Sequence, residues 1–350
     1  MLIRKEVRKL KGYHLEMPVC RVKLNQNESP FDLPEPLKRK ALERLSSVAW
    51  NRYPTPFCDP LRKKIAEREG WGAEGVVVTG GSNILIQAII IAAAVRGKIL
   101  TVSPGFSLYE IEGSLLGNRV IRLPLGKADF SFPRENFLKQ LRKAKPDVVF
   151  IANPNAPTGN LFSEDDLLAV CAKAPGLVVI DEAYYPFSGM TMAGHLRKFP
   201  NLVIIRTLSK AFSLGGGRLG YLLADPKVVG EILKVILPFS VGILSQTVGE
   251  VVLDKDNKNY VNSVVKETLE AREALYHALK ELPGLTVYPS RANFILFQSA
   301  RSEEILGKLA AEGILIRNVT DRGLPNSLRV SVGTKEENRL FLEGMKKILG

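Results

Sequence analysis

"NLVIIRTLSKAFSLGGGRLGYLLAD" (residues 201–225) joins two apolar segments through a loop of small residues that carries Lys210 and Arg218. Both segments are rich in Val, Ile and Leu and do not alternate strictly with polar residues. Continuous apolar runs of this length are typical of strands buried on both faces. The stretch therefore predicts two strands of a buried sheet, with an amine and a guanidinium in the loop between them.

The same kind of apolar run recurs along the chain from about residue 75, and helical patterns separate the runs. No internal repeat or low-complexity segment interrupts them. This alternation indicates an α/β fold with a mostly parallel sheet between two layers of helices, a three-layer architecture. The further runs are GVVVTG (75–80), KILTVS (98–103), NRVIRLPL (118–125), PDVVFIAN (146–153) and GLVVID (176–181).

After about residue 262 the pattern changes to a long charged helix followed by strand-like segments around another helix. This predicts a smaller α+β unit. The first 45 residues have no sheet pattern of their own, and their turn-rich segment NQNESPFDLPEP is typical of chain draped over another surface. We expect them to join the C-terminal unit. The predicted division is a large domain over 46–261 and a small domain made of 1–45 plus 262–350.

Composition and charge restrict the class of protein. The chain has 350 residues, of which 45% are hydrophobic and 24% charged, which excludes a mostly disordered chain. The net charge of +13 suits nucleic acid, an anionic substrate or a solvated surface. Basic residues alternate with acidic ones and form no stretch interleaved with aromatic residues. We therefore favour an anionic small molecule as partner over nucleic acid.

Several features favour a cytoplasmic protein that neither spans a membrane nor binds a metal. The apolar stretch 84–95 is shorter than the about 20 residues that cross a bilayer, so we expect a buried helix. The N-terminus has no apolar region of a secretion signal. Cysteines and histidines lie far apart without metal-ligand spacing, and the odd cysteine count argues against a disulfide framework. These residues are Cys20, Cys58, Cys171, His14, His195 and His277.

Chemically useful residues follow the predicted strands, where ligands of open α/β sheets bind. Gly80, Gly81, Ser82 and Asn83 end one strand before a helix and offer backbone N–H groups to an anion such as phosphate, although such a turn is often only structural. Phe106 follows the next strand, where its ring either packs in the core or covers a flat ligand.

Two further strand ends complete the pattern. Asp181 is placed to cap a helix or to bind a cationic ring nitrogen, and Tyr184 follows it. Lys210 lies near Arg218, which favours a lowered pKa and a nucleophilic amine, although most lysines are simply solvated. A pyridine aldehyde that carries a phosphate needs this combination of a lysine, an acid, a hydroxyl donor and an anion site.

The whole chain resembles the fold-type-I pyridoxal-phosphate (PLP) aminotransferases, and most closely the histidinol-phosphate aminotransferase group. The resemblance rests on nine segments, which are specific as a set: VRKLKGYH (7–14), KLNQNESP (23–30), NRYPTP (51–56), NPNAPTG (153–159), DEAYYPF (181–187), TLSKAFSLGGGRLGY (207–221), ANFILF (292–297), GILIRN (313–318) and LRVSVGT (328–334).

The resemblance implies PLP as cofactor and a role for each matching residue. Lys210 would bind the aldehyde and carry the substrate proton, Asp181 would pair with the ring nitrogen, and Tyr184 would contact the phenolic oxygen. Tyr53 would reach the cofactor phosphate of a second subunit, which implies a homodimer with shared active sites. The other implied contacts are Gly81, Ser82, Asn83, Thr207, Ser209 and Arg218 on the phosphate, Phe106 on the ring, and Arg329, Arg317 and Asn27 on an anionic substrate.

The chain departs from the family pattern at three places. Ala156 replaces an asparagine that donates to the ring oxygen, and we expect the neighbouring Asn155 to point elsewhere, so Tyr184 would hold that oxygen alone. Phe31 replaces a tyrosine that would meet a substrate phosphate. Three glycines at 215–217 replace bulkier residues before Arg218.

The function that follows from the resemblance is transfer of an amino group between histidinol phosphate and 2-oxoglutarate, as in histidine biosynthesis. An aromatic amino acid aminotransferase and a threonine-phosphate decarboxylase share the cofactor site and remain alternatives. A non-catalytic PLP-binding sensor is an alternative of another class, but the fold leaves no room for a DNA-binding unit. Ala156 is the one hint of a protein that has lost the cofactor.

Overall fold

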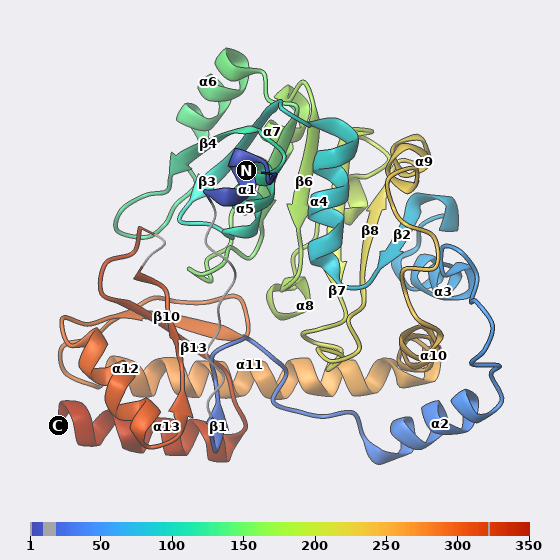
Figure 1. The fold of residues 1–350 in the computed structure, drawn as a ribbon. Helices are drawn as coiled ribbons and strands as arrows, with labels where there is room; N and C mark the ends of the chain where they lie inside the picture. The colour runs from blue at the N-terminus through green and yellow to red at the C-terminus, as the bar shows by residue number, and fades with distance from the viewer. Residues whose placement is uncertain (1, 10–18, 321–322) are drawn as a thin grey trace.

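The computed structural model describes residues 2–9, 19–320 and 323–350. Two β-sheets organise this part of the chain into a larger and a smaller body. The long helix α11 (Lys258–Lys280) runs beneath both bodies (Figure 1).

The larger body is built on a seven-stranded sheet with the order β2-β8-β7-β6-β5-β3-β4. All the apolar runs predicted as strands over 75–225 are found in it. β8 is antiparallel to both of its neighbours, and the other pairs are parallel. The prediction of a mostly parallel sheet is therefore confirmed. The strands are β2 (Val76–Thr79), β3 (Lys98–Ser103), β4 (Arg119–Pro124), β5 (Val148–Ala152), β6 (Leu177–Asp181), β7 (Leu202–Thr207) and β8 (Gly220–Ala224).

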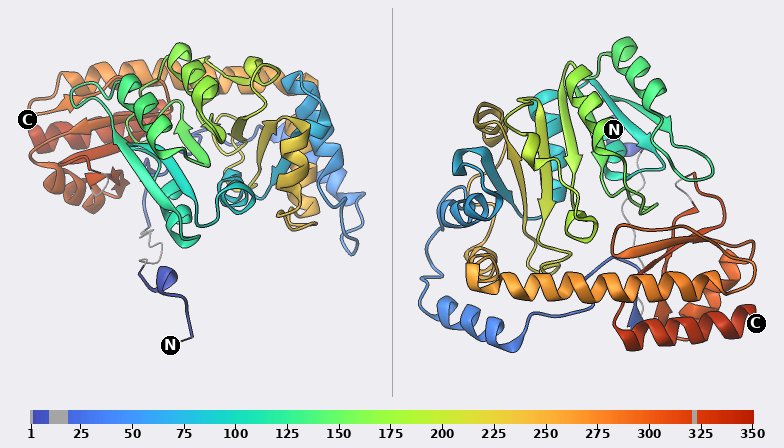
Figure 2. Two further views of the ribbon diagram at one scale, coloured as in Figure 1. Left: turned by 90° about the horizontal axis from the view of Figure 1, so that it is seen from above. Right: turned by 180° about the vertical axis from the view of Figure 1, so that it is seen from behind.

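Helices cover both faces of this sheet and complete the three predicted layers (Figure 2). On one face, buried Ile86 and Ile89 of α4 pack with strand residues, and on the other face Phe137 and Leu141 of α6 do the same. The first face carries α4 (Ser82–Ala93), α5 (Leu108–Leu115) and α9 (Pro226–Leu233); the second carries α3 (Asp59–Glu69), α6 (Arg134–Ala144), α7 (Glu164–Lys173) and α8 (Tyr185–Ser188).

The apolar stretch 84–95 forms most of α4, and its inward side chains are buried, as predicted for a core helix. Within the described residues, no helix combines the length and the apolar character needed to cross a membrane.

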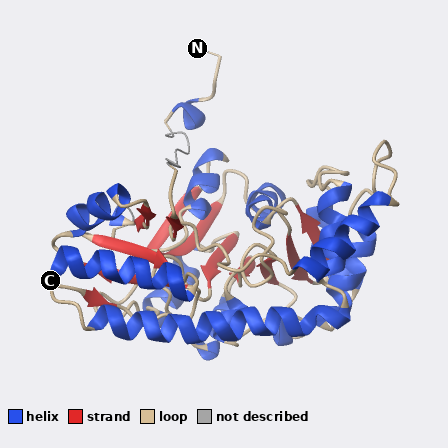
Figure 3. Cartoon of the chain, turned by 90° about the horizontal axis from the view of Figure 1, so that it is seen from below, coloured by secondary structure: helices blue, strands red, loops and turns tan. Residues whose placement is uncertain are grey.

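The smaller body has a four-stranded antiparallel sheet, β12-β13-β10-β9, which confirms the α+β prediction. α11 and α13 lie side by side across its underside (Figure 3). β1 (Val22–Lys23) pairs in parallel with β11 (Ile314–Leu315), so the N-terminal segment joins the C-terminal unit. The other elements are β9 (Thr286–Val287), β10 (Phe294–Gln298), β12 (Arg317–Asn318), β13 (Ser327–Ser331), α12 (Ser302–Ala311) and α13 (Lys335–Leu349).

Two N-terminal helices contact the larger body. α1 (Lys5–Arg8) lies against α5, where Arg4 Nη2 donates to the Leu115 carbonyl at 3.2 Å, and α2 (Glu35–Ser46) packs against α10 (Ile243–Val252). The predicted boundary at 261/262 falls inside α11. The domain division stays a prediction. The described residues also include the short 3-10 turns η1 (Ala73–Gly75), η2 (Ala193–His195) and η3 (Lys255–Asn257).

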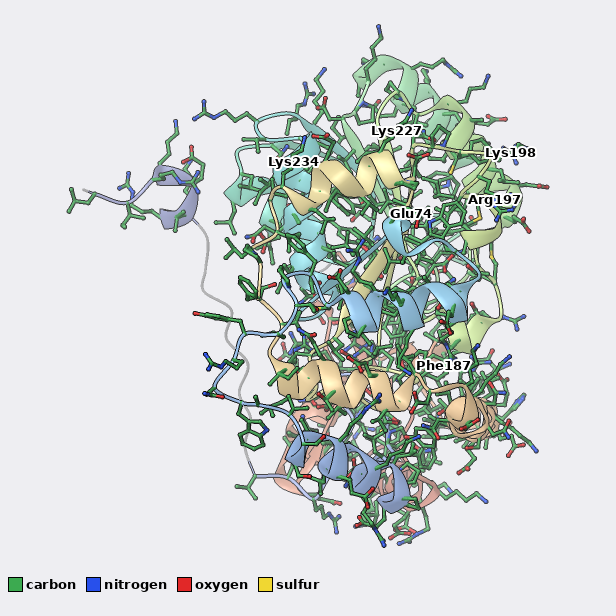
Figure 4. The ribbon with its side chains drawn as sticks, turned by 90° about the vertical axis from the view of Figure 1, so that its right-hand side faces the viewer. Glu74, Phe187, Arg197, Lys198, Lys227 and Lys234 are labelled. Carbon is green, nitrogen blue, oxygen red and sulfur yellow. The ribbon has the colours of Figure 1, made fainter. Side chains whose placement is uncertain are left out.

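Exposed positive charges lie on separate segments of one side of the molecule (Figure 4). Lys227 and Lys234 lie at opposite ends of α9, whereas Arg197 and Lys198 follow η2. All four side chains are exposed. The charge on this side is therefore spread over the surface, as on a well-solvated protein.

A buried ion-pair network joins the ends of β6 and β7. Arg206 is 1% exposed, and its Nε and Nη2 donate to Glu182 Oε2 at 3.0 and 2.7 Å. Its Nη1 binds Glu69 of α3, which also accepts from Tyr221 at 2.7 Å. Two buried carboxylates thus share one guanidinium, which lies 3.7 Å from the ring centroid of Tyr185.

We expect Arg206→Met to destabilise the protein by about 3–5 kcal/mol, because it leaves Glu182 and Glu69 buried without a cation. The exposed Arg339, which pairs with Glu336 and Glu343, is the matched control, and Arg339→Met should cost no more than about 1 kcal/mol. Urea unfolding measures both. Equal losses in the two variants would contradict the assigned role of Arg206.

Candidate functional site

The site forms where β2 and β7 end on either side of β8. Thr79, the last residue of β2, and Thr207, the last residue of β7, both pair with Gly220 at the start of β8. A Cβ at Gly220 would lie 2.2 Å from the backbone nitrogen of Ser82. Glycine at 220 therefore lets the start of α4 approach the end of β7.

This approach creates an anion cradle. Gly81 has φ +102°, and a Cβ there would lie 2.5 Å from Arg218 Nη2, so the guanidinium occupies the space that a side chain would fill. Arg218 Nη1 donates to Ser209 Oγ at 3.2 Å, and Thr207 Oγ1 lies 3.0 Å from that oxygen. No side chain caps the first turn of α4, so its positive end faces this space.

The structure thus brings together most of the residues predicted for the phosphate: Gly81, Ser82, Thr207, Ser209 and Arg218. Asn83, the second residue of α4, is exposed. A guanidinium, two hydroxyls and a helix N-terminus around a glycine match the donors that a phosphate group requires.

Asp181 ends β6 as a buried carboxylate, 6% exposed. Its Oδ2 accepts from Tyr109 Oη at 2.9 Å and its Oδ1 from the Ala183 N–H at 3.1 Å. Burial raises the pKa of Asp181 to about 6, and the two hydrogen bonds oppose that rise. A cationic ligand beside this carboxylate would restore its charged form.

Lys210 lies in the loop after β7, and its Nζ donates to the carbonyl oxygen of Gln26 at 3.0 Å. Burial, and then the positive charges of Arg329 and Arg218, lower its pKa to about 7. At neutral pH a large part of the amine is therefore unprotonated, which is the form that attacks an aldehyde.

Tyr184 faces this lysine and is held from the other side by the N-terminal segment. Lys210 Nζ lies 6.0 Å from the ring centroid of Tyr184. Asn27 Nδ2 donates to Tyr184 Oη at 2.9 Å. Phe294 of β10 packs edge-on against the same ring, with centroids 5.1 Å apart. Asn27 therefore contacts a predicted cofactor residue in this structure.

Arg329 and Arg317 lie directly opposite each other in the antiparallel pair β12–β13. Opposed residues project on the same face of a sheet, so the register places two positive side chains together. Arg329 Nη2 donates to the Asn25 carbonyl at 3.1 Å, and its guanidinium lies 5.2 Å from the Phe294 ring centroid. The two predicted substrate residues are thus neighbours.

The remaining predicted residues lie at the edges of this region. Phe106 contacts Tyr109 edge-on at 5.4 Å, and Tyr53 is 83% exposed. Ala156 is buried beside Tyr184, Ala292 and Phe294. As expected, Asn155 points away: its Nδ2 donates to Pro104 O and Thr158 Oγ1.

Sequence reasoning missed Tyr109 and the Glu182–Arg206 pair. Tyr109 follows Phe106 by three residues, so the two aromatic residues share one face of the turn that begins α5. That spacing was a usable signal. Glu182 and Arg206 are each adjacent to a predicted site residue, but a buried ion pair between strands leaves no periodic pattern.

Two cavities lie elsewhere. Their volumes are about 730 and 580 Å³, and both are lined by Arg68 and Tyr185, between α3, α8 and the start of α11. None of the predicted site residues lines them. The candidate site is defined by its converging polar groups.

The sequence predicts that the histidines and cysteines bind no metal. Within 2–9, 19–320 and 323–350, no cluster of His, Cys, Asp and Glu could hold a metal ion. His195 pairs with Glu164 at 2.5 Å, and Cys20, Cys58 and Cys171 are free thiols. His14 lies outside the described residues.

The raised pKa of Asp181 predicts a stability effect in the cofactor-free protein. An acid whose pKa rises on folding loses stability as pH increases from its usual value of 3.8 to about 6. Asp181→Asn should therefore stabilise the cofactor-free protein by up to about 3 kcal/mol at pH 8 and by little at pH 4. Urea unfolding at the two pH values measures this, with exposed Asp256→Asn as control. A gain of the same size at both pH values would refute the explanation.

Comparison with known proteins agrees with this geometry. The family model "Aminotransferase class I and II" matches residues 21–345. The histidinol-phosphate aminotransferase of Deinococcus radiodurans is 37% identical over 96% of this chain and 93% of its own. That of Caldanaerobacter subterraneus subsp. tengcongensis is 33% identical over 99% of both chains. The crystal structure of histidinol-phosphate aminotransferase from Sinorhizobium meliloti in complex with pyridoxal-5'-phosphate shares the fold, with a TM-score of 0.89, 21% identity and coverage of 99% and 97%. The chain belongs to the aminotransferase class I and II family.

Proposed function

We propose that this enzyme transfers an amino group between histidinol phosphate and 2-oxoglutarate, with PLP as cofactor, and serves histidine biosynthesis. One arrangement supports it best: Lys210 and Arg329 bind the neighbouring carbonyls of Gln26 and Asn25, while Arg218 binds Ser209, the residue before Lys210, so the lysine lies between two separate arginines. A cofactor phosphate and an anionic substrate need such a pair of sites on either side of one nucleophile. Relatives of full length carry the same activity in their names.

The cofactor would be held by the residues that the structure brings together. Arg218, Ser209, Thr207 and the first turn of α4 suit its phosphate, and Asp181 suits its ring nitrogen. When bound, PLP supplies an aldehyde that condenses with amines and a ring that withdraws electrons. Phe106 would cover the ring, and Tyr184 would donate to the ring oxygen.

Lys210 would then act twice. Its Nζ, with a pKa near 7, would hold the cofactor aldehyde in the resting enzyme. Once the substrate amine had displaced it, the same nitrogen would accept the proton from the substrate α-carbon and would deliver that proton to the cofactor. Its place beside Gln26 O keeps the amine close to the site when it is not bound covalently.

The register of β12 and β13 favours a phosphate as the substrate's anionic group. Two arginines directly opposite each other repel, and a dianion between Arg317 and Arg329 would remove that repulsion. An aromatic amino acid supplies a single carboxylate, which carries less negative charge than a phosphate dianion. Threonine phosphate meets the charge requirement equally well, so a decarboxylase of that substrate is the second candidate.

We further propose that the enzyme is a homodimer in the cytoplasm. Tyr53 is 83% exposed and contacts Phe239, itself 40% exposed, with ring centroids 4.9 Å apart. Trp50 is 66% exposed nearby in the sequence. The loop after Phe239 adjoins the anion cradle, since a Cβ at Gly80 would lie 3.9 Å from Ser240 O. An exposed aromatic surface beside the cradle suits a second subunit that shares the site.

The cytoplasmic location is supported by the cysteines, because free thiols suit a reducing compartment.

Half-reactions test the function directly. Histidinol phosphate should convert the visible absorbance of the PLP-loaded enzyme to that of the aminated cofactor, and 2-oxoglutarate should restore it. Lys210→Ala should abolish the exchange, whereas exposed Lys227→Ala should not. Release of carbon dioxide from threonine phosphate, without exchange with histidinol phosphate, would instead establish the decarboxylase.

Substrate selectivity tests the arginine pair. Arg317→Met should lower kcat/KM for histidinol phosphate about 10- to 100-fold, because a charge-assisted hydrogen bond contributes about 1.5–3 kcal/mol. The value for histidinol, which lacks the phosphate, should change little. An equal loss for both substrates would mean that Arg317 does not read the phosphate.

A further inference from the structure

Asn27 is anchored to the smaller body through its backbone and its side-chain oxygen. Its N–H donates to Ser331 Oγ at 2.8 Å, and its carbonyl accepts from Asn293 Nδ2 at 3.1 Å. The Ser331 hydroxyl donates back to Asn27 Oδ1 at 3.1 Å. Asn27 is 1% exposed and has φ +53°, a conformation that asparagine tolerates better than most residues.

These bonds determine which end of the Asn27 amide faces Tyr184. Because Oδ1 is engaged by Ser331, Nδ2 points to Tyr184 Oη, 2.9 Å away. An amide nitrogen only donates, so the phenolic oxygen accepts. The hydroxyl proton of Tyr184 is then directed away from Asn27.

The bond from Asn27 to Tyr184 matters because residues 155 and 156 do not supply an amide donor there. Residue 156, which packs with Tyr184, has only a methyl group. The amide of Asn155 is used by Pro104 and Thr158. Asn27 therefore supplies an amide donor to Tyr184 from the N-terminal segment.

We propose that Asn27 is a positioning residue that directs the Tyr184 hydroxyl proton at the ring oxygen of the bound cofactor. A hydroxyl that accepts a hydrogen bond becomes a stronger donor, because the two bonds polarise each other. Asn27 would thus strengthen the single side-chain contact that the ring oxygen receives from Tyr184. The inference rests on the proposed function, since it places Tyr184 beside that oxygen.

The expected signature is the pH at which the visible absorbance of the PLP-loaded enzyme changes. Without Asn27, Tyr184 is a weaker donor and stabilises the negative charge on the ring oxygen less. The proton between that oxygen and Lys210 Nζ is then lost only at a higher pH. Asn27→Gly, which φ +53° permits, should raise this midpoint by about 0.5–1 pH unit and weaken PLP binding about three- to tenfold. Within the described residues, the charged groups that act on Lys210 include Glu28, Lys23, Arg218 and Arg329, and Tyr109, which interacts with Tyr184, is hydrogen-bonded to Asp181.

A double-mutant cycle separates positioning from a structural role. Tyr184→Phe should raise the midpoint further than Asn27→Gly does. In the Tyr184→Phe background, Asn27→Gly should then change nothing more. Asn293→Ala is the matched control, because it removes the amide that binds the Asn27 carbonyl and leaves the contact with Tyr184 intact. It should lower the melting temperature without moving the midpoint.

Each other outcome has one meaning. Equal shifts by Asn27→Gly with and without Tyr184 would overturn the inference and leave the proposed function standing. An unchanged midpoint in Asn27→Gly, with a clear shift in Tyr184→Phe, would do the same. A wild-type protein that shows no visible band with PLP would overturn both the proposed function and the inference.

Discussion

The carboxylate of Asp181 is buried at the end of β6, and the charged residue next to it in the chain, Glu182, is also acidic. Burial raises its pKa to about 6, and the Tyr109 hydroxyl and the Ala183 N–H offset part of the penalty. A ligand that brings a protonated ring nitrogen removes this penalty and keeps its own proton by the same interaction. Burial of Asp181 thus lowers the free energy of unfolding of the cofactor-free protein. Because a ligand that binds only the folded state stabilises it, relief of this penalty adds to the affinity for the cofactor.

The pleat of the sheet separates this site from the network that supports it. Neighbouring residues of a strand point to opposite faces, so Asp181 and Thr207 face one side while Glu182 and Arg206 face the other. The backbone bond from Glu182 N–H to Ile205 O, 2.8 Å long, continues the ladder past the end of β6. The ion pair of Glu182 with Arg206 then fixes β6 and β7 in register directly behind the site. The position of the Asp181 carboxylate relative to the anion cradle therefore depends on groups that touch no ligand.

Most of the fold could be predicted from the sequence, because six of the seven strands in the larger sheet are apolar runs that are largely buried on both faces; the edge strand β4 is partly exposed. The two-residue strands β1, β11 and β12 could not, since so short a segment has no detectable period, whereas β9 lies inside the strand-like segment LTVYPS (285–290). The anion cradle could be predicted, because the sequence has a glycine turn directly before a helix. The contact of Tyr109 with Asp181 did not, because it joins residues 72 positions apart through a single hydroxyl, and a buried aromatic residue on a helix ordinarily indicates only packing. The pairing of Arg317 with Arg329 depends on strand register, which the sequence specifies only weakly at a short edge strand.

The N-terminal segment 25–29 is where the two bodies meet at the site. Its consecutive residues contact three different site residues: the Asn25 carbonyl accepts from Arg329, the Gln26 carbonyl from Lys210, and the Asn27 amide donates to Tyr184. Ser29 Oγ adds a contact at 2.8 Å to Ser213, beyond Lys210 in the same loop. Because an extended chain cannot shift one residue without moving its neighbours, a shift of this segment would move its contacts with Arg329, Lys210 and Tyr184 together. A substrate anion that draws Arg329 toward it would therefore act through this segment on Lys210 and Tyr184. The contacts with Arg329 and Lys210 are made by backbone carbonyls, which no side-chain substitution removes, whereas the contact with Tyr184 depends on the Asn27 side chain.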